Sequence, residues 1–450
     1  MGQSECRTAG QLGTPFVLRG RSEVFDSRTS RLPPLDWHCV CEVLLHLQCE
    51  NLDIQAGASP PIERSLAGVI TQFGPTYEAR TGFRFTLEHR KAMTAIVRCR
   101  TAALGGHVVE CKDCGGQAYA FHSCRHRACP RCMRDDVEEW LQQRQAELLP
   151  VPYFHIIFKV PQKLHKLFRG HKRELYPLLA TAAAKAIQKV ADDSRYLGAT
   201  TGVMAVVHTS GANLAYHPHI HCLMPAGGLD DEGKWRPTKH PGFAPETLLG
   251  MAFKDALLAS MRPVAKQLKL QLPARCRNGW SVHVEVPAHG VDKVLKYLAS
   301  SFLRGPLHKH QILDVTSTHV TFNYPDPHLK DRRVMTLEGH EFLRRFLLHV
   351  WPEKLHQVRY FGLWSRKSAA RLKALRQQLL PTTTTTTAPH HTAQPADDKE
   401  KNTEPHWLKC PRCAGLRVVI ARFERGKTPP LLTHPLPPGP YPPRPPQPQQ

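Results

Sequence analysis

The chain has 450 residues, of which 61 are Lys or Arg and 38 are Asp or Glu, so its formal charge is +23. This length fits two or three domains, and a hydrophobic share of 41% is enough for at least one sizeable core. No run of about 18–20 apolar residues and no signal-peptide pattern is found, which excludes membrane-embedded and visibly secreted classes. We therefore expect a cytoplasmic protein, and so large a positive excess is typical of a polyanionic partner, most often nucleic acid.

The first predicted elements are helices around a cysteine-rich segment. Residues 1–62 show no regular period and are expected to be an irregular extension. Apolar residues at helical intervals predict helices between 68 and 98, and another helix follows the cysteines at 135–149. Residues 63–149 are expected to form one domain, and its cysteines and basic residues, described below, predict that it binds zinc and DNA.

From residue 150 the pattern becomes a mixture of strands and helices. Alternating apolar segments predict strands, and two of them, at 202–208 and 217–224, are joined by a short turn and are expected to form a hairpin. The mixture predicts an α+β fold with an antiparallel-sheet core over residues 150–325. The other predicted strands are 153–161 and 280–286, with more strand-like segments up to 324, and the predicted helices are 164–191 (interrupted near Pro177), 243–268 (interrupted near Pro263) and 291–302.

The last part of the chain divides in two. Residues 326–380 are expected to be a helical region, with helices at 337–350 and 365–380. Residues 381–450 contain a threonine run and a proline-rich end, so they are expected to be a disordered, low-complexity tail. This tail carries one CxxC pair, Cys410 and Cys413.

The spacing of the cysteines favours a metal site over a disulfide framework. The CxxC pairs Cys111/Cys114 and Cys129/Cys132 are separated by 14 residues, close to the interval at which two zinc-ribbon knuckles supply four thiolates. Without a signal peptide, a reducing compartment is expected. The alternative is a set of scattered buried thiols. We predict that these four cysteines bind Zn²⁺.

The cysteine-rich segment is also strongly basic. Residues 89–134 hold nine Lys and Arg and two acidic residues, a local charge of +7. We expect this surface, including Arg125, Arg127 and Arg131, to bind DNA phosphates rather than to catalyse a reaction. The alternative is a solvated basic face without a partner.

A run of alternate histidines is the main candidate for a catalytic metal site. On a strand, His217, His219 and His221 share one face and can converge on one divalent ion. His208, at the end of the preceding predicted strand, is a further candidate ligand. Imidazole suits a catalytic cation whose other positions stay open to substrate oxygens. Surface histidines without a metal are the alternative.

A tyrosine on a predicted helix is the candidate nucleophile. Lys293 lies one turn before Tyr297, and Lys296 lies beside it. A phenol titrates near about 10, so an attacking Tyr297 needs positive charge nearby or a metal-polarised phosphate. The alternative is an ordinary core tyrosine.

Several motifs occur together in one order, and the chain from about 68 to 365 resembles the rolling-circle insertion-sequence transposases of the HUH nuclease superfamily, which have an N-terminal zinc-binding domain. The agreement of many ordered motifs is more specific than any one of them. The motifs are RTAALGGH at 100–107, SCRHRACPRC at 123–132, LLPVPYFH at 148–155, HTSG at 208–211, HPHIHC at 217–222, YLA at 297–299 and FLRRFLLHV at 342–350.

The resemblance implies a transposase that nicks and joins single-stranded DNA at element ends and target. His219 and His221 would hold Mg²⁺ or Mn²⁺, and Tyr297 would form a 5′-phosphotyrosine and free a 3′-hydroxyl. Lys293 and Lys296 would bind the DNA backbone through charge. The resemblance also implies a bacterial, nucleoid-associated protein.

The chain departs from the family pattern at two places. The second tyrosine of the two-tyrosine relatives is replaced by Ser301, as in single-tyrosine relatives. The usual histidine before the CPxC unit is replaced by Ala128. The candidate ligands for a second zinc ion are Cys99, His107, Cys124 and His126.

The missing second tyrosine leaves two further hypotheses. One is a zinc-dependent DNA-binding protein whose nuclease site has decayed. The other is a metal-dependent phosphodiesterase that uses water as its nucleophile.

Overall fold

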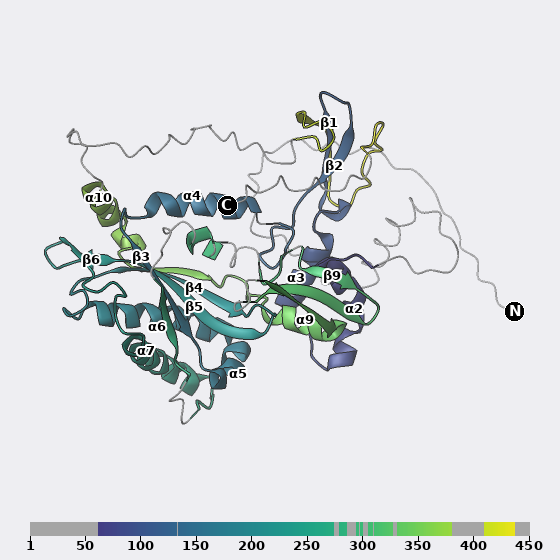
Figure 1. Cartoon of the computed structure of the whole chain (residues 1–450). Helices are drawn as coiled ribbons and strands as arrows, with labels where there is room; N and C mark the ends of the chain where they lie inside the picture. Colours follow the sequence, from purple (N-terminus) through teal and green to yellow (C-terminus); the bar gives the residue numbers. More distant parts are fainter. Residues whose placement is uncertain are drawn as a thin grey trace, which may run out of the picture.

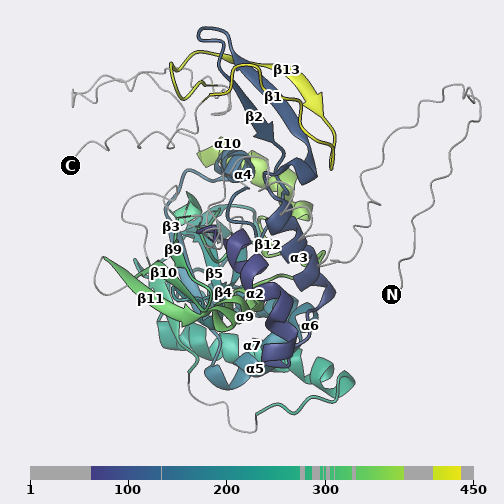
Figure 2. The same cartoon turned by 90° about the vertical axis from the view of Figure 1, so that its right-hand side faces the viewer.

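The computed structural model has a main body, built on a β-sheet with helices packed against it, and a β-hairpin that projects from this body. Figure 1 shows the sheet above helices α5, α6 and α7, and in Figure 2 the hairpin stands at the opposite end of the molecule from these helices. In the described part of the chain, no helix is long and apolar enough to cross a lipid bilayer. The described residues are 62–132, 134–273, 279–285, 294–296, 298–299, 305–308, 310–326, 331–379 and 409–436.

The main sheet has five strands in the order β12-β4-β5-β3-β8, and all its neighbouring strands are antiparallel. Strands β4 and β5 form the expected hairpin. The alternation along β5 separates the two faces of the sheet: Ile220 and Met224 are fully buried on one face, whereas His219 and His221 point to the other. The strands are β3 (Tyr153–Lys159), β4 (Gly202–Ser210), β5 (Tyr216–Pro225), β8 (Val282–Glu285) and β12 (Val358–Gly362).

Three helices cover the apolar face of the sheet: α5 (Gln162–Gly170), α6 (Lys172–Ala191) and α7 (Glu246–Gln267). The buried face of α6 is rich in alanine, including Ala180 and Ala183, so the backbone of this helix approaches its neighbours closely. This face of α6 and the side chains on the helix-covered face of the sheet belong to the largest hydrophobic cluster of the described chain.

A second cluster joins the N-terminal helices to a small sheet further along the chain. Helices α2 (Leu66–Thr81), α3 (Leu87–Arg98) and α9 (Gly339–Leu348) pack with β9 (Ile312–Val315), β10 (His319–Pro325) and β11 (Arg332–Glu338).

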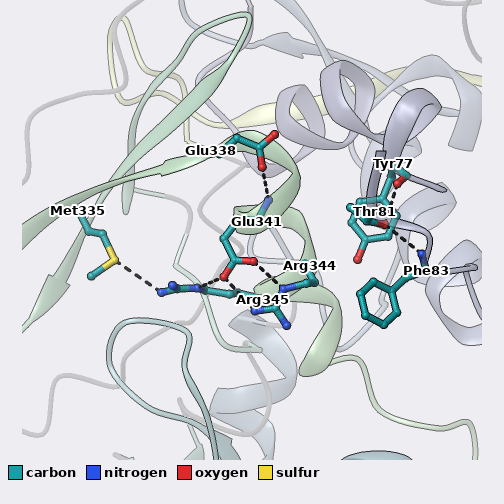
Figure 3. A network of polar contacts seen from close by, with 8 residues as sticks. All are labelled: Tyr77, Thr81, Phe83, Met335, Glu338, Glu341, Arg344 and Arg345. Carbon is teal, nitrogen blue, oxygen red and sulfur yellow. Dashed lines mark hydrogen bonds and ion pairs between the residues drawn. The ribbon is translucent and has the colours of Figure 1, made fainter. Parts of the chain in front are cut away.

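Polar contacts fix the ends of the helices in this cluster (Figure 3). The Glu338 carboxylate caps α9 by accepting a 3.1 Å hydrogen bond from the Glu341 backbone N–H. The Glu341 carboxylate in turn accepts hydrogen bonds from Arg344 and Arg345 at 2.6–2.9 Å. At the end of α2, the Thr81 hydroxyl donates to the carbonyl of Tyr77. These contacts fix the connection between β11 and α9.

The projecting hairpin belongs to a separate three-stranded sheet in the order β13-β1-β2. Its strands are β1 (Gly106–Cys111), β2 (Gln117–Phe121) and β13 (Arg417–Phe423). Figure 2 shows β13 lying beside β1 although the two strands are some 300 residues apart in sequence. The remaining elements are α4 (Arg134–Glu147), β6 (Gly227–Leu229), β7 (Trp235–Pro237), α10 (Ala369–Leu379) and the 3₁₀ turns η1 (Ala102–Leu104) and η2 (Arg366–Ser368).

The expected α+β fold with an antiparallel core and an N-terminal cysteine-rich module is confirmed, but several details differ. The long helix breaks at His171, whose φ of −129° and ψ of 53° are not helical, and continues through Pro177. Helix α7 continues through Pro263.

Two C-terminal segments also differ from the expected organisation. Strand β12, in the region expected to be helical, is the edge strand of the main sheet, and residues 409–436, expected in the low-complexity tail, contain β13. Short strands that complete a sheet with distant partners give little local signal. The domain boundaries at 149, 325 and 380 stay predictions.

Candidate metal centres and nuclease site

Three histidines converge on the face of the main sheet that lies opposite α5, α6 and α7. His208 lies at the end of β4 directly opposite His219 of β5, and His221 follows two residues later on the same face. One ring nitrogen from each lies within 4.8 Å of the other two. The ring centroids of His208 and His221 are 4.3 Å apart, and those of His219 and His221 are 4.9 Å apart. Three converging imidazoles can hold one divalent cation and leave its remaining positions open.

His208 completes this trio, and His217 does not belong to it. The antiparallel register pairs His208 with His219 across the hairpin, which brings their side chains onto adjoining positions. His217 lies at the beginning of β5, where its ring packs against those of His219 at 5.3 Å and His165 at 5.5 Å. Of the two further expected ligands, His208 belongs to the group whose ring nitrogens converge, and His217 does not.

Two neighbouring groups orient the ligand rings. The Nδ1 atom of His219 lies 2.7 Å from the carbonyl oxygen of His217, to which only a protonated Nδ1 can donate. The Nε2 atom of His219 is then the one that carries a lone pair for a metal. His217 thus contributes its backbone, rather than its imidazole, to the site.

A second line of contacts runs from a carboxylate to His221. The Glu285 carboxylate lies 3.0 Å from Nδ1 of His155, and Nε2 of His155 lies 2.8 Å from Nδ1 of His221. If Nδ1 of His155 donates to Glu285, its Nε2 accepts from Nδ1–H of His221, and Nε2 of His221 carries the ligating lone pair. Hydrogen bonds of this kind fix the tautomer of a metal-binding histidine and raise its basicity.

Sequence reasoning missed His155 and Glu285. Both lie on strands that were predicted correctly, β3 and β8, and the register of these strands pairs them directly. His155 also ends the LLPVPYFH motif. The pairing of β3 with both β5 and β8 was the missing information, because it alone brings the three side chains into line.

Burial keeps the three histidines neutral at neutral pH. It lowers the pKa of His219 to about 4 and the pKa values of His208 and His221 well below the ordinary value of 6.5. A neutral imidazole is the form that ligates a metal. At pH 7 a cation therefore does not have to displace a proton from any of the three imidazoles.

A cavity of about 250 Å³ opens next to the trio. His208 and His219 line one side, and Arg127 and Ala128 from the cysteine-rich segment line another. His349 also lines the cavity, and its side chain is buried. Its Nδ1 atom lies 3.1 Å from the Thr209 hydroxyl, and its Nε2 atom lies 3.1 Å from the carbonyl oxygen of Leu214. The cavity therefore joins the histidine trio to the cysteine-rich module.

The expected nucleophile, Tyr297, lies outside the described residues, as do Lys293 and Ser301. The residues on either side of it are described: 294–296 and 298–299 are helical. Leu295 and Leu298 are fully buried in a cluster with Leu223, which follows His221 on the same face of β5. The described residues on either side of position 297 thus pack on the face of the sheet that carries the trio.

A cluster of four cysteines lies between α3 and α4. Its thiols belong to Cys99 at the end of α3 and to Cys124, Cys129 and Cys132 in the loop between β2 and α4, and all four sulfurs lie within 4.8 Å of one another. The Sγ atoms of Cys124 and Cys132 are 3.6 Å apart. Four thiols at this separation match the tetrahedral zinc sites of structural metal centres.

The expected zinc ribbon of Cys111, Cys114, Cys129 and Cys132 is wrong in its pairing. Cys111 and Cys114 lie at the tip of the β1–β2 hairpin, whereas Cys129 and Cys132 lie beyond its base. A six-residue strand rises about 20 Å, too far for one ion to bridge. Cys111 and Cys114 instead meet Cys410 and Cys413.

The second expected ligand set is only half correct. Cys99 and Cys124 belong to the cluster with Cys129 and Cys132, but the two expected histidine ligands do not. The Nε2 atom of His107 lies 3.1 Å from Nε2 of His122. Nδ1 of His126 accepts a hydrogen bond from the backbone N–H of Ala128.

The basic residues expected to bind DNA have different environments. Arg127 is partly buried, and its guanidinium donates to the carbonyls of Leu355 and Pro352 at 2.9 and 3.0 Å. Arg131 forms an ion pair with Glu63. Arg125 and Lys296 are exposed. Arg127 and Arg131 therefore attach the cysteine loop to the body, whereas Arg125 and Lys296 stay candidates for DNA contact.

Comparison with known protein families gives two matches along the chain. Residues 69–160 match the family model described as "Transposase zinc-binding domain", of IS91 type, and residues 202–371 match the model described as "Putative transposase". The first covers the cysteine cluster, and the second covers the histidine trio.

Two relatives align over most of the chain. A "Putative transposase" of Sinorhizobium fredii is 35% identical over 389 residues, covering 81% of this chain and 97% of the relative. The transposase for insertion sequence element IS801 of Pseudomonas savastanoi pv. phaseolicola is 25% identical over 359 residues, covering 75% and 84%. Among solved structures, a metal-bound conjugative relaxase TrwC in complex with oriT DNA matches at 12% identity and a TM-score of 0.23, covering 51% of this chain and 72% of that chain.

Proposed function

Because this chain belongs to the family of IS91-type rolling-circle transposases, we propose that it nicks single-stranded DNA at element ends and joins it to a target through a covalent 5′-phosphotyrosine at Tyr297. The observation that carries the proposal is the convergence of His208, His219 and His221 beside a cavity. A trio of buried, neutral imidazoles that opens to such a space is suited to bind a cation in contact with substrate.

In the proposed reaction, the phenol oxygen of Tyr297 attacks the scissile phosphorus. A bond forms between that oxygen and phosphorus as the phenol loses its proton, the P–O3′ bond breaks, and the leaving 3′ oxygen takes up a proton to become a hydroxyl. The new phosphodiester conserves the bond energy, so a later attack by another 3′-hydroxyl restores the tyrosine without ATP. Mg²⁺ or Mn²⁺, held by the three histidines, would polarise the scissile phosphate.

The chain's own residues supply positioning and charge for this reaction. His155 and the His217 carbonyl hold the rings of His221 and His219 in place. Lys296 is exposed one residue before Tyr297 and, with Lys293, is proposed to bind the DNA backbone. The burial of Leu295 and Leu298 on the same face of the sheet as the trio supports the choice of Tyr297, which lies between them in the sequence, as the nucleophile.

The cysteine-rich module is proposed to hold DNA beside the nuclease site. Zn²⁺ at Cys99, Cys124, Cys129 and Cys132 would fix the loop that carries exposed Arg125. The adjoining cavity is lined by residues of both modules, which supports this arrangement. Since the DNA of a bacterial element lies in the nucleoid, we place the working protein in the cytoplasm.

A nicking assay on histidine variants tests the role of the trio. Labelled single-stranded DNA from an element end is incubated with Mn²⁺ and either wild-type protein or the His219→Ala/His221→Ala double variant. We expect the double variant to lose nicking and to keep DNA binding, because the phosphate loses its polarising cation while the basic surfaces remain.

The matched control is His217→Ala, which removes an imidazole from the same strand but outside the trio. It should nick at close to the wild-type rate because it keeps the 217 backbone carbonyl. Undiminished nicking by the double variant would contradict the assignment. DNA binding by the wild-type protein without any nicking would favour the decayed DNA-binding module.

A further inference from the structure

Four thiols from two distant parts of the chain meet at the tip of the projecting hairpin. Cys111 and Cys114 belong to the turn between β1 and β2, and Cys410 and Cys413 precede β13. The Sγ atoms of Cys111 and Cys413 are 3.4 Å apart, and those of Cys114 and Cys410 are 3.8 Å apart. A tetrahedral Zn²⁺ site with bonds of about 2.3 Å requires sulfurs about 3.8 Å apart. The spacing thus fits one ion.

The backbone around each CxxC pair has the same local geometry. In the first turn the Gly115 N–H donates to the carbonyl of Cys111, and in the second the Ala414 N–H donates to the carbonyl of Cys410, both at 2.9 Å. Gly115 and Ala414 have φ of 64° and 60°. A non-glycine residue in this region costs free energy, which indicates that the surroundings impose the turn at Ala414. Two equivalent turns present two thiols each.

The C-terminal segment is an integral part of the hairpin sheet. Strand β13 pairs with β1 from Cys111↔Arg417 to Gly106↔Phe423. The Phe423 ring packs edge-on against Phe121 of β2 at 5.8 Å. Beyond β13, the Tyr119 hydroxyl donates to the carbonyl of Pro430. These contacts hold the two CxxC turns in register, so the four thiols meet because of the sheet.

We propose that Cys111, Cys114, Cys410 and Cys413 bind a second structural Zn²⁺, separate from the ion at the Cys99 cluster, and thereby clasp the C-terminal segment to the N-terminal module. The family match to the zinc-binding domain ends at residue 160, so it does not include two of these ligands. Closing a loop of some 300 residues by a metal restricts the unfolded chain strongly. This second zinc site does not depend on whether Tyr297 is the nucleophile.

Metal analysis of the full-length protein tests this clasp. The Cys410→Ser/Cys413→Ser variant is expected to contain one zinc ion fewer per chain than the wild type. The matched variant Cys124→Ser/Cys132→Ser should also lose one ion, and a protein with all four changes should lose two. Zinc content unchanged by Cys410→Ser/Cys413→Ser would overturn the proposal.

Alkylation of the unaltered protein provides a test that does not depend on a variant's folding. Cys413 is exposed, and an exposed free thiol reacts readily with iodoacetamide. We expect Cys413 to be protected until a zinc chelator is added, with buried Cys222 as the control that stays unreactive in both conditions. Equal reactivity of Cys413 with and without chelator would overturn the proposal, as would protection that only a reductant relieves, the mark of a disulfide.

Discussion

At the scale of single residues, the site depends on contacts behind the metal ligands. His155 stands between the Glu285 carboxylate and His221, and the ring planes of His155 and His221 are nearly parallel, at 15°. The alternation of histidines along one strand could be predicted from sequence, because it depends only on local geometry. His155 and Glu285 could not, because their role depends on which strands pair.

Removing His155 should weaken metal binding without removing a ligand. His155→Ala and Glu285→Gln are expected to lower the Mn²⁺ affinity about 10- to 100-fold, because the His221 ring loses the hydrogen bond that orients it. Nicking should recover at high Mn²⁺. The measurement is Mn²⁺ binding by titration calorimetry, together with the Mn²⁺ dependence of nicking.

Glu246→Gln is the control for Glu285→Gln. Glu246 lies 3.1 Å from Nδ1 of His283, a similar carboxylate–imidazole contact that includes no residue of the trio. This variant should bind Mn²⁺ as the wild type does. Equal Mn²⁺ affinity in the His155→Ala and wild-type proteins would contradict the positioning role.

Buried His349 should make the protein less stable in mild acid. Burial lowers the pKa of His349 to about 4, against 6.5 in the unfolded chain. Above pH 6.5 both states are neutral at this position and the group has no effect. Between pH 6.5 and about 4 only the unfolded state takes up the proton, so stability falls, by up to about 3 kcal/mol from this residue.

Urea unfolding at several pH values checks this expectation. The free energy of unfolding of the wild type should fall from pH 6.5 to pH 4.5, and that of His349→Gln should fall less steeply. Parallel pH profiles for the two proteins would show that His349 does not contribute to acid sensitivity.

At the scale of elements, the correctly predicted strands and helices are those with a clear period. Strands β4 and β5 and helices α2 and α3 were predicted because alternation or helical spacing persists over several residues. Strand β12 was missed because it is short and gains its stability from pairing with β4. The expected grouping of the two CxxC pairs was wrong for a related reason. Their spacing in the sequence suggested that they meet, but the β1–β2 hairpin places one pair at its tip and the other beyond its base.

The junction between β12 and β4 is sensitive to side-chain size. Gly362 has φ of 58°, and a Cβ atom at this position would overlap the carbonyl oxygen of Thr201. Gly362→Ala therefore adds a steric clash to the cost of a left-handed conformation and should lower the free energy of unfolding by about 3 kcal/mol or more. Chemical denaturation measures the change.

Gly82→Ala separates these two costs. Gly82 ends α2 with φ of 70°, and a Cβ atom there meets nothing within 4 Å. Only the conformational cost, about 1 kcal/mol, should appear. Similar losses for both variants would show that the contact with Thr201 does not matter.

At the scale of the whole molecule, the cysteine-rich module and the nuclease sheet share one cavity. Arg127 reaches from the cysteine loop to the carbonyls of Leu355 and Pro352, next to the wall formed by His208. The net charge of +23 predicted a polyanionic partner, and the ordered motifs predicted the family. Neither could show how the modules meet, because this depends on packing between residues more than 200 positions apart.

The proposed covalent link between Tyr297 and DNA can be measured directly. Labelled single-stranded DNA from an element end should, with Mn²⁺, give an adduct with the full-length protein that survives denaturing electrophoresis. Tyr297→Phe should bind the DNA without forming the adduct, and the control Tyr196→Phe should form it as the wild type does. Cleavage by the wild type with no adduct, or an adduct that persists in Tyr297→Phe, would contradict a covalent link at Tyr297.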